Sequence, residues 1–357
     1  MDDLRNSLIA DVCGEKGPLP LIRSYCRNHI EEPESDIPDR IARLVEPGSA
    51  ARGADLVGSL AERHIKLITL LDPTYPLMLK QIADPPLVLF YSGECQALHR
   101  PAVGIVGSRK AGTYGRQVAR QLAGELARLG FVIASGLAHG IDARAHTACL
   151  DVEGRTVAVL GSGIDTIYPR DHRDLGRRIV LGGGAVISEM PPGTPPKPFH
   201  FPIRNRIISG LSHAVIVVEA QPRSGSLVTA RHCLEQGREL FAVPGPINQP
   251  GSQGTNQLIA KGEAQLVLSL ESILEHLGPI LGLAAQHQAR LEAVIEHPLS
   301  KKIYERLDAF EPLPLDLLVA ELGEETGVLL ARLVELEARN LVERRPGHLY
   351  VRNPLQL

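Results

Sequence analysis

The 357-residue chain contains no tryptophan, and aromatic residues make up only 4% of it. Any stacking on nucleic-acid bases must therefore rest on few side chains. The five cysteines are widely scattered and form no Cys-x-x-Cys pair, which argues against a disulfide framework and a cysteine zinc cage and favours a cytoplasmic protein. No apolar run approaches the ~20 residues of a membrane helix. The first 17 residues lack a basic region followed by an apolar core, so we expect neither membrane association nor a secretory signal.

Net charge is also small, at −3 for the whole chain, and it neither supports nor excludes a polyanionic partner. Positive charge is nevertheless concentrated in one segment, because residues 197–238 contain six Lys/Arg against two Asp/Glu. The hydrophobic content of 44% and the charged content of 22% are ordinary for a globular protein. A chain of this length has room for two or three domains with their own cores.

The basic segment overlaps the stretch 201–245, which alternates helix, strand, turn, helix and strand. Residues 214–219 form a nearly unbroken apolar run, as expected of a parallel strand buried on both faces. The small, donor-rich turn Arg223-Ser224-Gly225-Ser226 follows, where the next helix should begin. Because the first N–H groups of a helix lack partners and point outward, this turn is predicted to bind an anion.

The region from residue 101 to 278 repeats a unit of strand, glycine-rich turn and helix. The predicted strands include residues 103–106, 131–134, 156–160, 185–188, 214–219 and 265–268. Such alternation implies right-handed crossovers between parallel strands. The sequence therefore predicts an α/β fold with an extended Rossmann-like, doubly wound parallel sheet.

This core is predicted to span residues 83–279, between two other domains. Residues 1–82 have helical spacing broken by prolines, which predicts a helical domain, and a helix-hairpin-helix around residues 14–22 is the alternative to a small bundle. A proline-rich connector leads into an edge strand near residues 87–91. After a linker, residues 296–357 combine three helical stretches with two short strands, which predicts a winged-helix domain.

Ligands of an open parallel sheet bind beyond the carboxyl ends of its strands, where the strand order reverses. Small residues follow most of the predicted strands, as in Gly107-Ser108-Arg109, Ser135-Gly136 and Gly161-Ser162-Gly163. They let the backbone approach a phosphate closely, so an anionic ligand is expected. The first turn lacks the Gly-x-Gly-x-x-Gly fingerprint and the second strand ends without an acid, so no dinucleotide or other cofactor is predicted. The guanidinium in the first turn favours a longer polyanion.

Two groups of polar residues have more than one interpretation. His139, Asp142 and His146 have spacings that suit metal ligands, but no further carboxylate or cysteine completes the set. Capping and packing are favoured, and no metal is predicted. Ser224 and Ser226 suit either nucleophiles or phosphate donors at a helix start, and the second role is favoured because no base and orienting acid are evident. No catalytic residue is therefore predicted.

Several segments together resemble the DprA/Smf family, the DNA-processing proteins of natural transformation. They are GIVGSRKAGTYG, SGLAHGIDARAH, AVLGSGIDTIYPRDH, SEMPPGTPP and the stretch 201–245. The resemblance is dense over residues 68–277. It implies a Rossmann-like core that binds single-stranded DNA, forms a homodimer and loads the RecA recombinase onto the strand. It also implies a sterile-alpha-motif-like helical domain in front and a winged-helix domain at the end, although residues 1–65 match poorly.

The resemblance also implies roles for particular residues. Arg109 belongs to a Gly-Ser-Arg motif that contacts DNA, Arg170 and Lys197 stand where many members have a basic residue along the DNA, and Arg204-Asn205-Arg206 matches an Arg-Asn-Arg segment. His139 is not expected to be fixed in the family. Together with the anion-binding turn, the expected DNA-binding residues are Gly107, Ser108, Arg109, Arg170, Lys197, Phe199, Phe201, Arg204, Asn205, Arg206, Ser224, Gly225 and Ser226.

Two other functions compete with this one. The first is a Rossmann-like nucleotide or phosphoribosyl hydrolase resembling the lysine-decarboxylase-like family, whose Pro-Gly-Gly-x-Gly-Thr-x-x-Glu motif has no counterpart here. The second is a transcription regulator, but its recognition helix, LLARLVELEAR, would be mostly apolar and acidic, which disfavours reading of the major groove. We therefore expect a cytoplasmic, non-enzymatic protein that protects incoming single-stranded DNA and loads RecA in transformation and homologous recombination.

Overall fold

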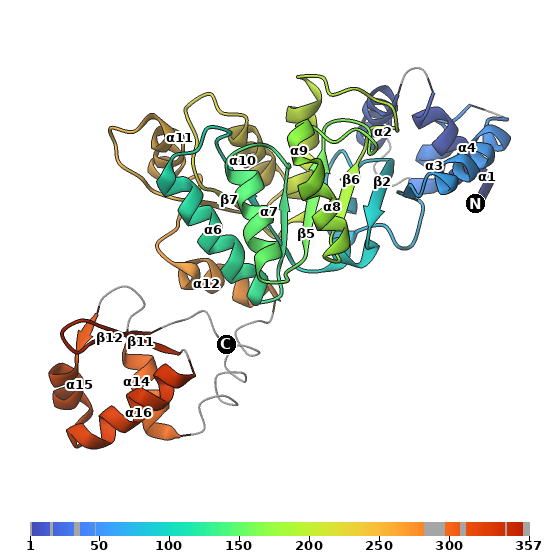
Figure 1. Cartoon of the computed structure of the whole chain (residues 1–357). Helices are drawn as coiled ribbons and strands as arrows, with labels where there is room; N and C mark the ends of the chain where they lie inside the picture. Colours follow the sequence, from blue (N-terminus) through green and yellow to red (C-terminus); the bar gives the residue numbers. More distant parts are fainter. Residues whose placement is uncertain are drawn as a thin grey trace. The chain divides into compact units, whose positions relative to one another are not determined.

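The computed structural model describes residues 2–14, 17–31, 36–46, 48–281, 297–307, 312–339 and 341–352. The chain divides into two compact units, Met1–Ile273 and Leu274–Leu357 (Figure 1). The first contains a nine-stranded sheet and the second a three-stranded one. The division into three domains at residues 82, 279 and 296 stays a prediction, because the helices before residue 82 share one hydrophobic core with the large sheet.

The large sheet has the strand order β1-β2-β6-β5-β4-β3-β7-β8-β9. Its seven mutually parallel strands are β3 (Ala102–Val106), β4 (Val132–Ser135), β5 (Thr156–Leu160), β6 (Ala185–Ser188), β7 (Ala214–Val217), β8 (Glu239–Ala242) and β9 (Gln265–Leu266). Every residue of β3 to β7 is buried, as the apolar runs predicted. The predicted α/β fold with a doubly wound parallel sheet is confirmed.

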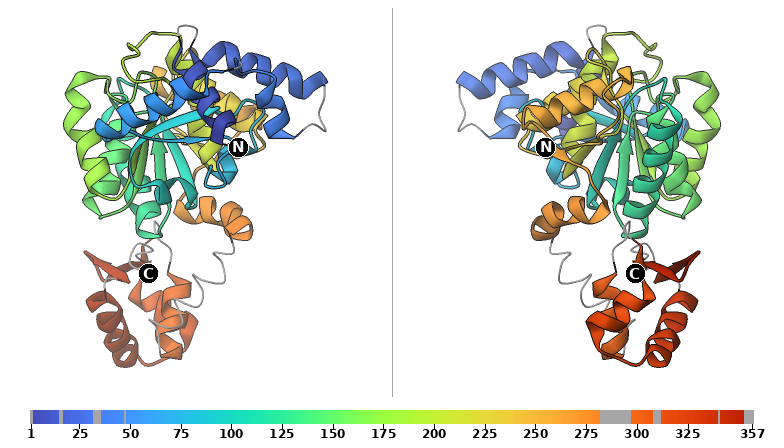
Figure 2. Two further views of the ribbon diagram at one scale, coloured as in Figure 1. Left: turned by 90° about the vertical axis from the view of Figure 1, so that its right-hand side faces the viewer. Right: turned by 90° about the vertical axis from the view of Figure 1, so that its left-hand side faces the viewer.

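Helices cover both faces of this sheet. One face carries the row α6 (Thr113–Arg128), α7 (Ile141–Asp151) and α8 (Arg173–Leu181), and the other carries α9 (His200–Leu211) and α10 (Ser226–Glu235) (Figures 1 and 2). Two further helices follow: α11 (Pro250–Ala260) packs on β8, and α12 (Leu270–Leu281) comes after β9. In a right-handed crossover, the direction in which the chain moves along the sheet decides which face the connecting helix covers. The change of face therefore marks the point where the strand order reverses.

The reversal lies at β3. From β3 the chain adds β4, β5 and β6 on one side, then crosses through α9 and adds β7 on the other side of β3. In the β3–β7 register Val103 pairs with Ala214 and Val106 with Val217, so the two strands end at the same level. The turns that follow β3 and β7 therefore diverge and leave a crevice beyond the sheet edge.

Two details of the predicted sheet are wrong. The sequence indicated an edge strand near residues 87–91, but β2 (Val88–Gly93) lies inside the sheet, antiparallel to β6. The edge is formed by β1 (Lys66–Thr69), which lies within the residues 1–82 that were predicted to be helical. His64 has a positive φ of 56°, which ends the preceding helix and reverses the chain, so that Leu67 pairs with Phe90.

The N-terminal segment is helical, as predicted, with α1 (Asp2–Val12), α2 (Pro18–Glu31), α3 (Ile37–Ala42), α4 (Ala50–Glu62) and the short α5 (Leu77–Lys80) in the proline-rich connector. The predicted turn at residues 14–22 includes residues 15 and 16, which lie outside the described residues. Leu8, Ile9 and Ile41 are fully buried. They belong to the same apolar core as β2, so this segment packs directly on the antiparallel side of the sheet.

The second unit is the winged-helix domain that was predicted. It contains α14 (Pro298–Arg306), α15 (Leu315–Leu322) and α16 (Thr326–Ala338), with a sheet of β10 (Leu313–Pro314), β12 (Leu349–Arg352) and β11 (Val342–Arg345). The sequence had indicated two strands, and β10 adds a third. The predicted linker at 279–297 lies mostly outside the described residues. Across the described parts of both units, no helix is long and apolar enough to cross a membrane.

Candidate nucleic-acid interface

A cavity of about 610 Å³ opens beyond the carboxyl ends of β3, β4 and β7. The lining comes from the end of β3 and the turns after β3, β4 and β7, together with α9 and α10. It consists of residues 106–110, Ala138, Asp142, Tyr168, Pro198, Phe201, Pro202, Arg204, Asn205, Ile208, Gln221, residues 223–226 and Thr229. We call this cavity the switch-point cavity. The turns predicted to bind an anion thus meet at one place, because the carboxyl ends of parallel strands lie at the same edge.

Positive charge dominates the lining of the switch-point cavity. Four basic side chains line it, from Arg109, Lys110, Arg204 and Arg223, against the single carboxyl of Asp142. Arg109 is exposed and makes no ion pair with a carboxylate in the described part of the chain. Its guanidinium carbon lies 5.3 Å from the centre of the Phe201 ring. An aromatic contact orients a guanidinium without neutralising it, so Arg109 keeps its full charge for a ligand.

Arg204 is buried beneath the cavity, with 4% of its surface exposed. Its Nη1 donates to the carbonyl oxygen of Gly136 over 3.0 Å, and its Nε has no partner within the described residues. Burial lowers the pKa of the guanidinium to about 10, against the opposing effect of the Asp142 carboxyl. Arg204 is therefore still charged at neutral pH, and its buried Nε–H has no partner among the described residues.

Gly136 allows this arrangement. A Cβ at that position would lie 2.5 Å from Nη2 of Arg204 and 2.8 Å from Oδ2 of Asp142. The same Oδ2 accepts from the backbone N–H of Gly136 over 3.1 Å and of Ala138 over 3.4 Å. Burial raises the pKa of the Asp142 carboxyl, while Arg204 and these two donors act in the opposite direction. Asp142 thus holds the turn after β4, which is a structural role and not that of a metal ligand.

The turn after β7 presents the start of α10 to the cavity. Gly225 is the N-cap residue and has nothing within 4 Å of where a Cβ would lie, so a phosphate can approach its backbone. Oγ of Ser224 lies 2.8 Å from Oγ of Ser226. Asn205 donates through Nδ2 to the carbonyl oxygen of Gly225 over 3.2 Å and so anchors the turn. No described histidine hydrogen bonds with either serine, which favours the donor role over the nucleophile role.

Aromatic side chains lie at one rim of the cavity. The rings of Tyr168 and Phe201 are 5.6 Å apart, and both residues line the cavity. Phe199 is 54% exposed, and Nζ of Lys197 lies 5.9 Å from the centre of its ring. Neither residue lines the cavity itself; they flank it beside Pro198. Few aromatics are present in the chain, yet the structure gathers three of them next to the basic residues.

The remaining expected residues differ in placement. Gly107 and Ser108 line the cavity beside Arg109, whereas Arg170 is exposed in the short 3₁₀ helix η2 (Arg170–His172) outside the lining. Lys110, Arg223 and Tyr168 line the cavity but were missing from the expected set. The sequence could have indicated all three, because Lys110 follows Arg109, Arg223 precedes Ser224, and Tyr168 lies in one of the segments that resemble the DprA/Smf family.

Arg206 faces the opposite way. Its side chain is 2% exposed, and its Nη1 donates to Oε2 of Glu189 over 2.9 Å. Its Nε lies 2.9 Å from Oδ2 of Asp84, and the neighbouring carboxylates raise the pKa of the guanidinium. This placement argues against the expected contact with DNA, because both faces of the guanidinium fork are already paired within the protein. We leave Arg206 out of the interface.

His146 also lies away from the cavity, fully buried. Oγ1 of Thr156 donates to the carbonyl oxygen of Ile133 over 2.6 Å, so Nδ1 of His146 must be the donor in the 2.6 Å bond to that hydroxyl. Burial lowers the pKa of His146 to about 3, so the ring is neutral. The metal interpretation of His139, Asp142 and His146 is therefore not supported by geometry: His146 packs in the core and Asp142 holds a turn.

Known proteins resemble this chain over most of its length. The family model for DNA recombination-mediator protein A matches residues 66–278, and the model for the DprA winged helix domain matches residues 287–348. Protein Smf of Escherichia coli is 44% identical over 281 residues, which are 78% of this chain and 75% of the relative. DNA processing protein DprA of Bacillus subtilis is 45% identical over 223 residues, which are 62% and 74% of the two chains.

Solved structures agree with the sequence matches. An X-ray structure of DNA processing protein A from Streptococcus pneumoniae superposes with a TM-score of 0.61 at 34% identity and covers 77% of this chain and 97% of that one. A structure of the Helicobacter pylori protein, described by its single-stranded DNA binding mode, gives a TM-score of 0.54 at 32% identity and covers 60% and 96%. The resemblance inferred from the motifs is confirmed.

Proposed function

The chain belongs to the DNA recombination-mediator protein A family, and on this premise we propose that it binds single-stranded DNA in the switch-point cavity during natural transformation. One observation carries the proposal: the guanidinium of Arg109, which no described carboxylate neutralises, lies beside the aromatic rings of Phe201 and Tyr168 at the rim of the cavity. Cations that follow a phosphate backbone and rings that stack on bases are the two parts of sequence-tolerant single-strand binding. The relative from Helicobacter pylori, described as binding single-stranded DNA, adds support.

The lining suggests how a strand is held. Arg109, Lys110 and Arg223 supply exposed charges for phosphates, while the start of α10 offers the open backbone of Gly225. The N–H groups of Ser226, Leu227 and Val228 already donate within the turn. Phe201 and Tyr168 offer ring faces at the same rim. None of these contacts selects a base by hydrogen bonds to its edge, so we expect little sequence preference. Lys197 and Arg170 extend the charged path on the flanks.

We propose that the chain acts by binding and not by catalysis. Hydroxyls of Ser224 and Ser226 pair with each other, and the carboxyl of Asp142 is buried and occupied by backbone donors. A hydrolase needs a nucleophile or water with a base in reach, and the described lining of the cavity offers no free base. The family's description as a recombination mediator supports the same conclusion.

Three finer parts of the proposal come from the family resemblance. We propose that the protein protects incoming single strands, that it loads the RecA recombinase onto them, and that it does so as a homodimer in the cytoplasm. A mediator must hold the strand without competing permanently with the recombinase, which favours a salt-dependent interface such as the switch-point cavity. Light scattering tests the dimer, because a monomer at working concentrations would contradict it.

The test of DNA binding compares nucleic-acid forms. Fluorescence anisotropy of the full chain with a labelled oligothymidylate and with a duplex of equal length should show tighter binding of the single strand, weakening with salt. Nucleotide hydrolysis is measured in the same preparation. Preference for the duplex, or ATP turnover that disappears in Ser224→Ala, would instead support the winged-helix regulator or the hydrolase.

A further inference from the structure

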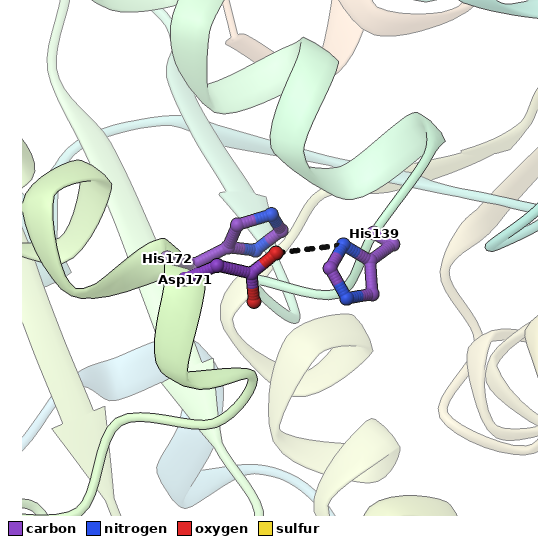
Figure 3. Close-up of side chains that lie close together, drawn as sticks. All are labelled: His139, Asp171 and His172. Carbon is purple, nitrogen blue, oxygen red and sulfur yellow. Dashed lines mark ion pairs between the residues drawn. The ribbon is translucent and has the colours of Figure 1, made fainter.

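Three potential metal ligands meet beside the switch-point cavity, and none of them has a role in the proposed DNA contacts. They are His139, in the turn after β4, and Asp171 and His172, in η2 (Figure 3). One ligand atom from each lies within 4.8 Å of the others. Nδ1 of His139 is 3.7 Å from Oδ2 of Asp171, and the two imidazole centres are 4.6 Å apart. The close-up shows the carboxylate of Asp171 directed toward the ring of His139, with the ring of His172 beside it (Figure 3).

These distances are near those of a metal site. Ligand atoms about 2.0–2.1 Å from a tetrahedral zinc ion are separated from each other by about 3.3–3.4 Å. The ligand atoms lie within 4.8 Å of one another, so each separation needs to shrink by at most about 1.5 Å. The side chains of His139 and Asp171 are 50% and 66% exposed, so rotation about their own bonds can close the set without moving the backbone.

The surroundings already orient one ligand. Nδ1 of His172 donates to the carbonyl oxygen of Leu137 over 2.8 Å, which leaves Nε2 of the same ring as the lone-pair donor. Leu137 is buried and has a positive φ of 56°, uncommon for a residue with a side chain. Oδ2 of Asp142 accepts hydrogen bonds from the backbone N–H groups of Gly136 and Ala138, on either side of Leu137. The carbonyl group of Leu137 is therefore fixed in position. Such a second hydrogen bond is the usual device that sets the tautomer of a metal-binding histidine.

We propose that His139, Asp171 and His172 bind one zinc ion, with the fourth position open to water or to a phosphate oxygen. Two imidazoles and a carboxylate suit zinc and its neighbours in the first transition row and do not suit magnesium or calcium, which prefer oxygen ligands. This proposal differs from the sequence-based expectation that no metal binds. That expectation considered His139 together with Asp142 and His146 of α7, whereas the structure brings His139 next to η2.

The position suggests a consequence for DNA. His139 lines a small cavity together with Arg109, Tyr168, Phe201 and Arg204, so a bound ion would add positive charge at the edge of the switch-point cavity. It would also tie the turn after β4 to the segment that carries Tyr168 and Arg170. Binding of zinc should therefore strengthen DNA binding; this second part rests on the proposed function, whereas the metal site does not.

The first experiment measures the ion directly. Full-length, untagged protein is freed of metal and titrated with Zn²⁺ by calorimetry and with Co²⁺ by visible absorption. One ion per chain should bind in the micromolar range, and the cobalt spectrum should lack a thiolate charge-transfer band. His139→Ala and Asp171→Asn should each weaken binding by about tenfold or more. Both side chains are half exposed or more, so neither change should prevent folding.

A matched control is available on α10. Nδ1 of His232 lies 3.4 Å from Oε2 of Glu235, a histidine–carboxylate pair with no third ligand in the described residues. His232→Ala should leave zinc binding unchanged. Unaltered stoichiometry and affinity in the His139→Ala and Asp171→Asn proteins, or no binding by the wild type at micromolar zinc, would overturn the proposal and leave His139 and Asp171 as a simple ion pair.

The second experiment separates the metal site from the proposed function. Single-strand affinity is measured with zinc and with a chelator in the wild type, in His139→Ala and in Arg109→Ala. Zinc should strengthen binding by the wild type several-fold and have no effect on His139→Ala. Arg109→Ala should lose affinity for DNA in both conditions and still bind zinc. Zinc binding without any DNA binding would contradict the proposed function alone, and a zinc effect that persists in His139→Ala would contradict the link between the two.

Discussion

The guanidinium of Arg109 lies over the ring of Phe201, with 5.3 Å from Cζ to the ring centre. Arg109 follows β3 and Phe201 lies in α9, so the contact spans the point where the strand order reverses. It holds a cation at the rim of the switch-point cavity without pairing it to a carboxylate. A cation–π contact at such a site contributes about 0.5–1 kcal/mol. This is enough to orient the side chain but too little to prevent Arg109 from binding a phosphate.

Arg109→Ala should therefore weaken binding of single-stranded DNA more than any other single change in the cavity. A charge-assisted hydrogen bond contributes about 1.5–3 kcal/mol, which corresponds to a loss of about tenfold to a hundredfold. The loss should be similar for different base sequences, and the slope of log K against log salt should fall by about 0.7. Anisotropy titrations at several salt concentrations measure both. Arg178→Ala, which removes an exposed arginine on α8, serves as control; equal losses in both variants would contradict the assignment.

Phe201→Leu should weaken single-strand binding by about 1–3 kcal/mol, because a base loses its stacking surface. It should also loosen Arg109, so the two changes should not be additive. A double-mutant cycle with Arg109→Ala measures the coupling, expected at about 0.5 kcal/mol or more. Additive losses would mean that the two residues act on different nucleotides. Circular dichroism checks the fold, since a Cβ at Gly161 would meet the Phe201 ring at 2.9 Å and the packing there is close.

Arg206→Ala should reduce the free energy of unfolding by about 3–5 kcal/mol, because it leaves the carboxylate of Glu189 buried and unpaired. Urea denaturation measures the change. The double variant Arg206→Met/Glu189→Leu should recover most of the loss, since replacing both partners removes the buried charge. A stable Arg206→Ala protein with impaired DNA binding would instead support the family expectation that this arginine contacts DNA.

Deletion of residues 296–357 should leave single-strand binding largely intact. All residues of the switch-point cavity belong to the first compact unit. In the deleted domain, Glu335 of α16 pairs with Arg332 at 2.8 Å and with Arg339 at 3.1 Å, so these arginines are partly neutralised. Anisotropy with the truncated protein is the measurement. Loss of binding in a truncated protein that remains folded by circular dichroism would place an essential contact in the winged-helix domain.

His146→Asn should make stability less dependent on pH. The folded pKa of His146 is about 3 and the unfolded value about 6.5, so below pH 6.5 the unfolded chain binds the extra proton. The contribution of the neutral His146 ring to the free energy of unfolding is fully present above pH 6.5. It falls by at most about 1.4 kcal/mol per pH unit as the pH drops toward 3. Asn keeps a donor near Thr156 and does not titrate. Urea melts from pH 7.5 to 4.5 should give a shallower slope in the variant; parallel slopes would contradict the buried neutral ring.

Much of the fold could be predicted because its signals are local. The apolar runs at residues 156–160 and 185–188 gave strand bounds that coincide with β5 and β6, and the glycine-rich turns indicated where the chain leaves the sheet. β1 was missed because its first three residues continue the helical spacing of apolar residues that begins in α4. Its identity as a strand depends on pairing with β2, across the proline-rich connector.

The interface was predicted less completely. Sequence treats Arg204-Asn205-Arg206 as one basic segment, but residues two apart on a helix point about 200° away from each other. Arg204 consequently reaches the turn at Gly136, while Arg206 meets Glu189 on the other side of α9. Which arginine faces the ligand depends on how the helix packs, and no pattern along the chain contains that information.

The sequence by itself determined the α/β class, the family and the turns that carry the anion-binding residues, because each of these depends on residues that are neighbours in the chain. Tertiary structure alone decided that Arg109 lies against Phe201 and that His139 meets Asp171 and His172. These contacts join segments that β-strands and helices separate along the chain. They follow from strand order and from the rotation of each helix about its axis, which the burial of the whole core sets.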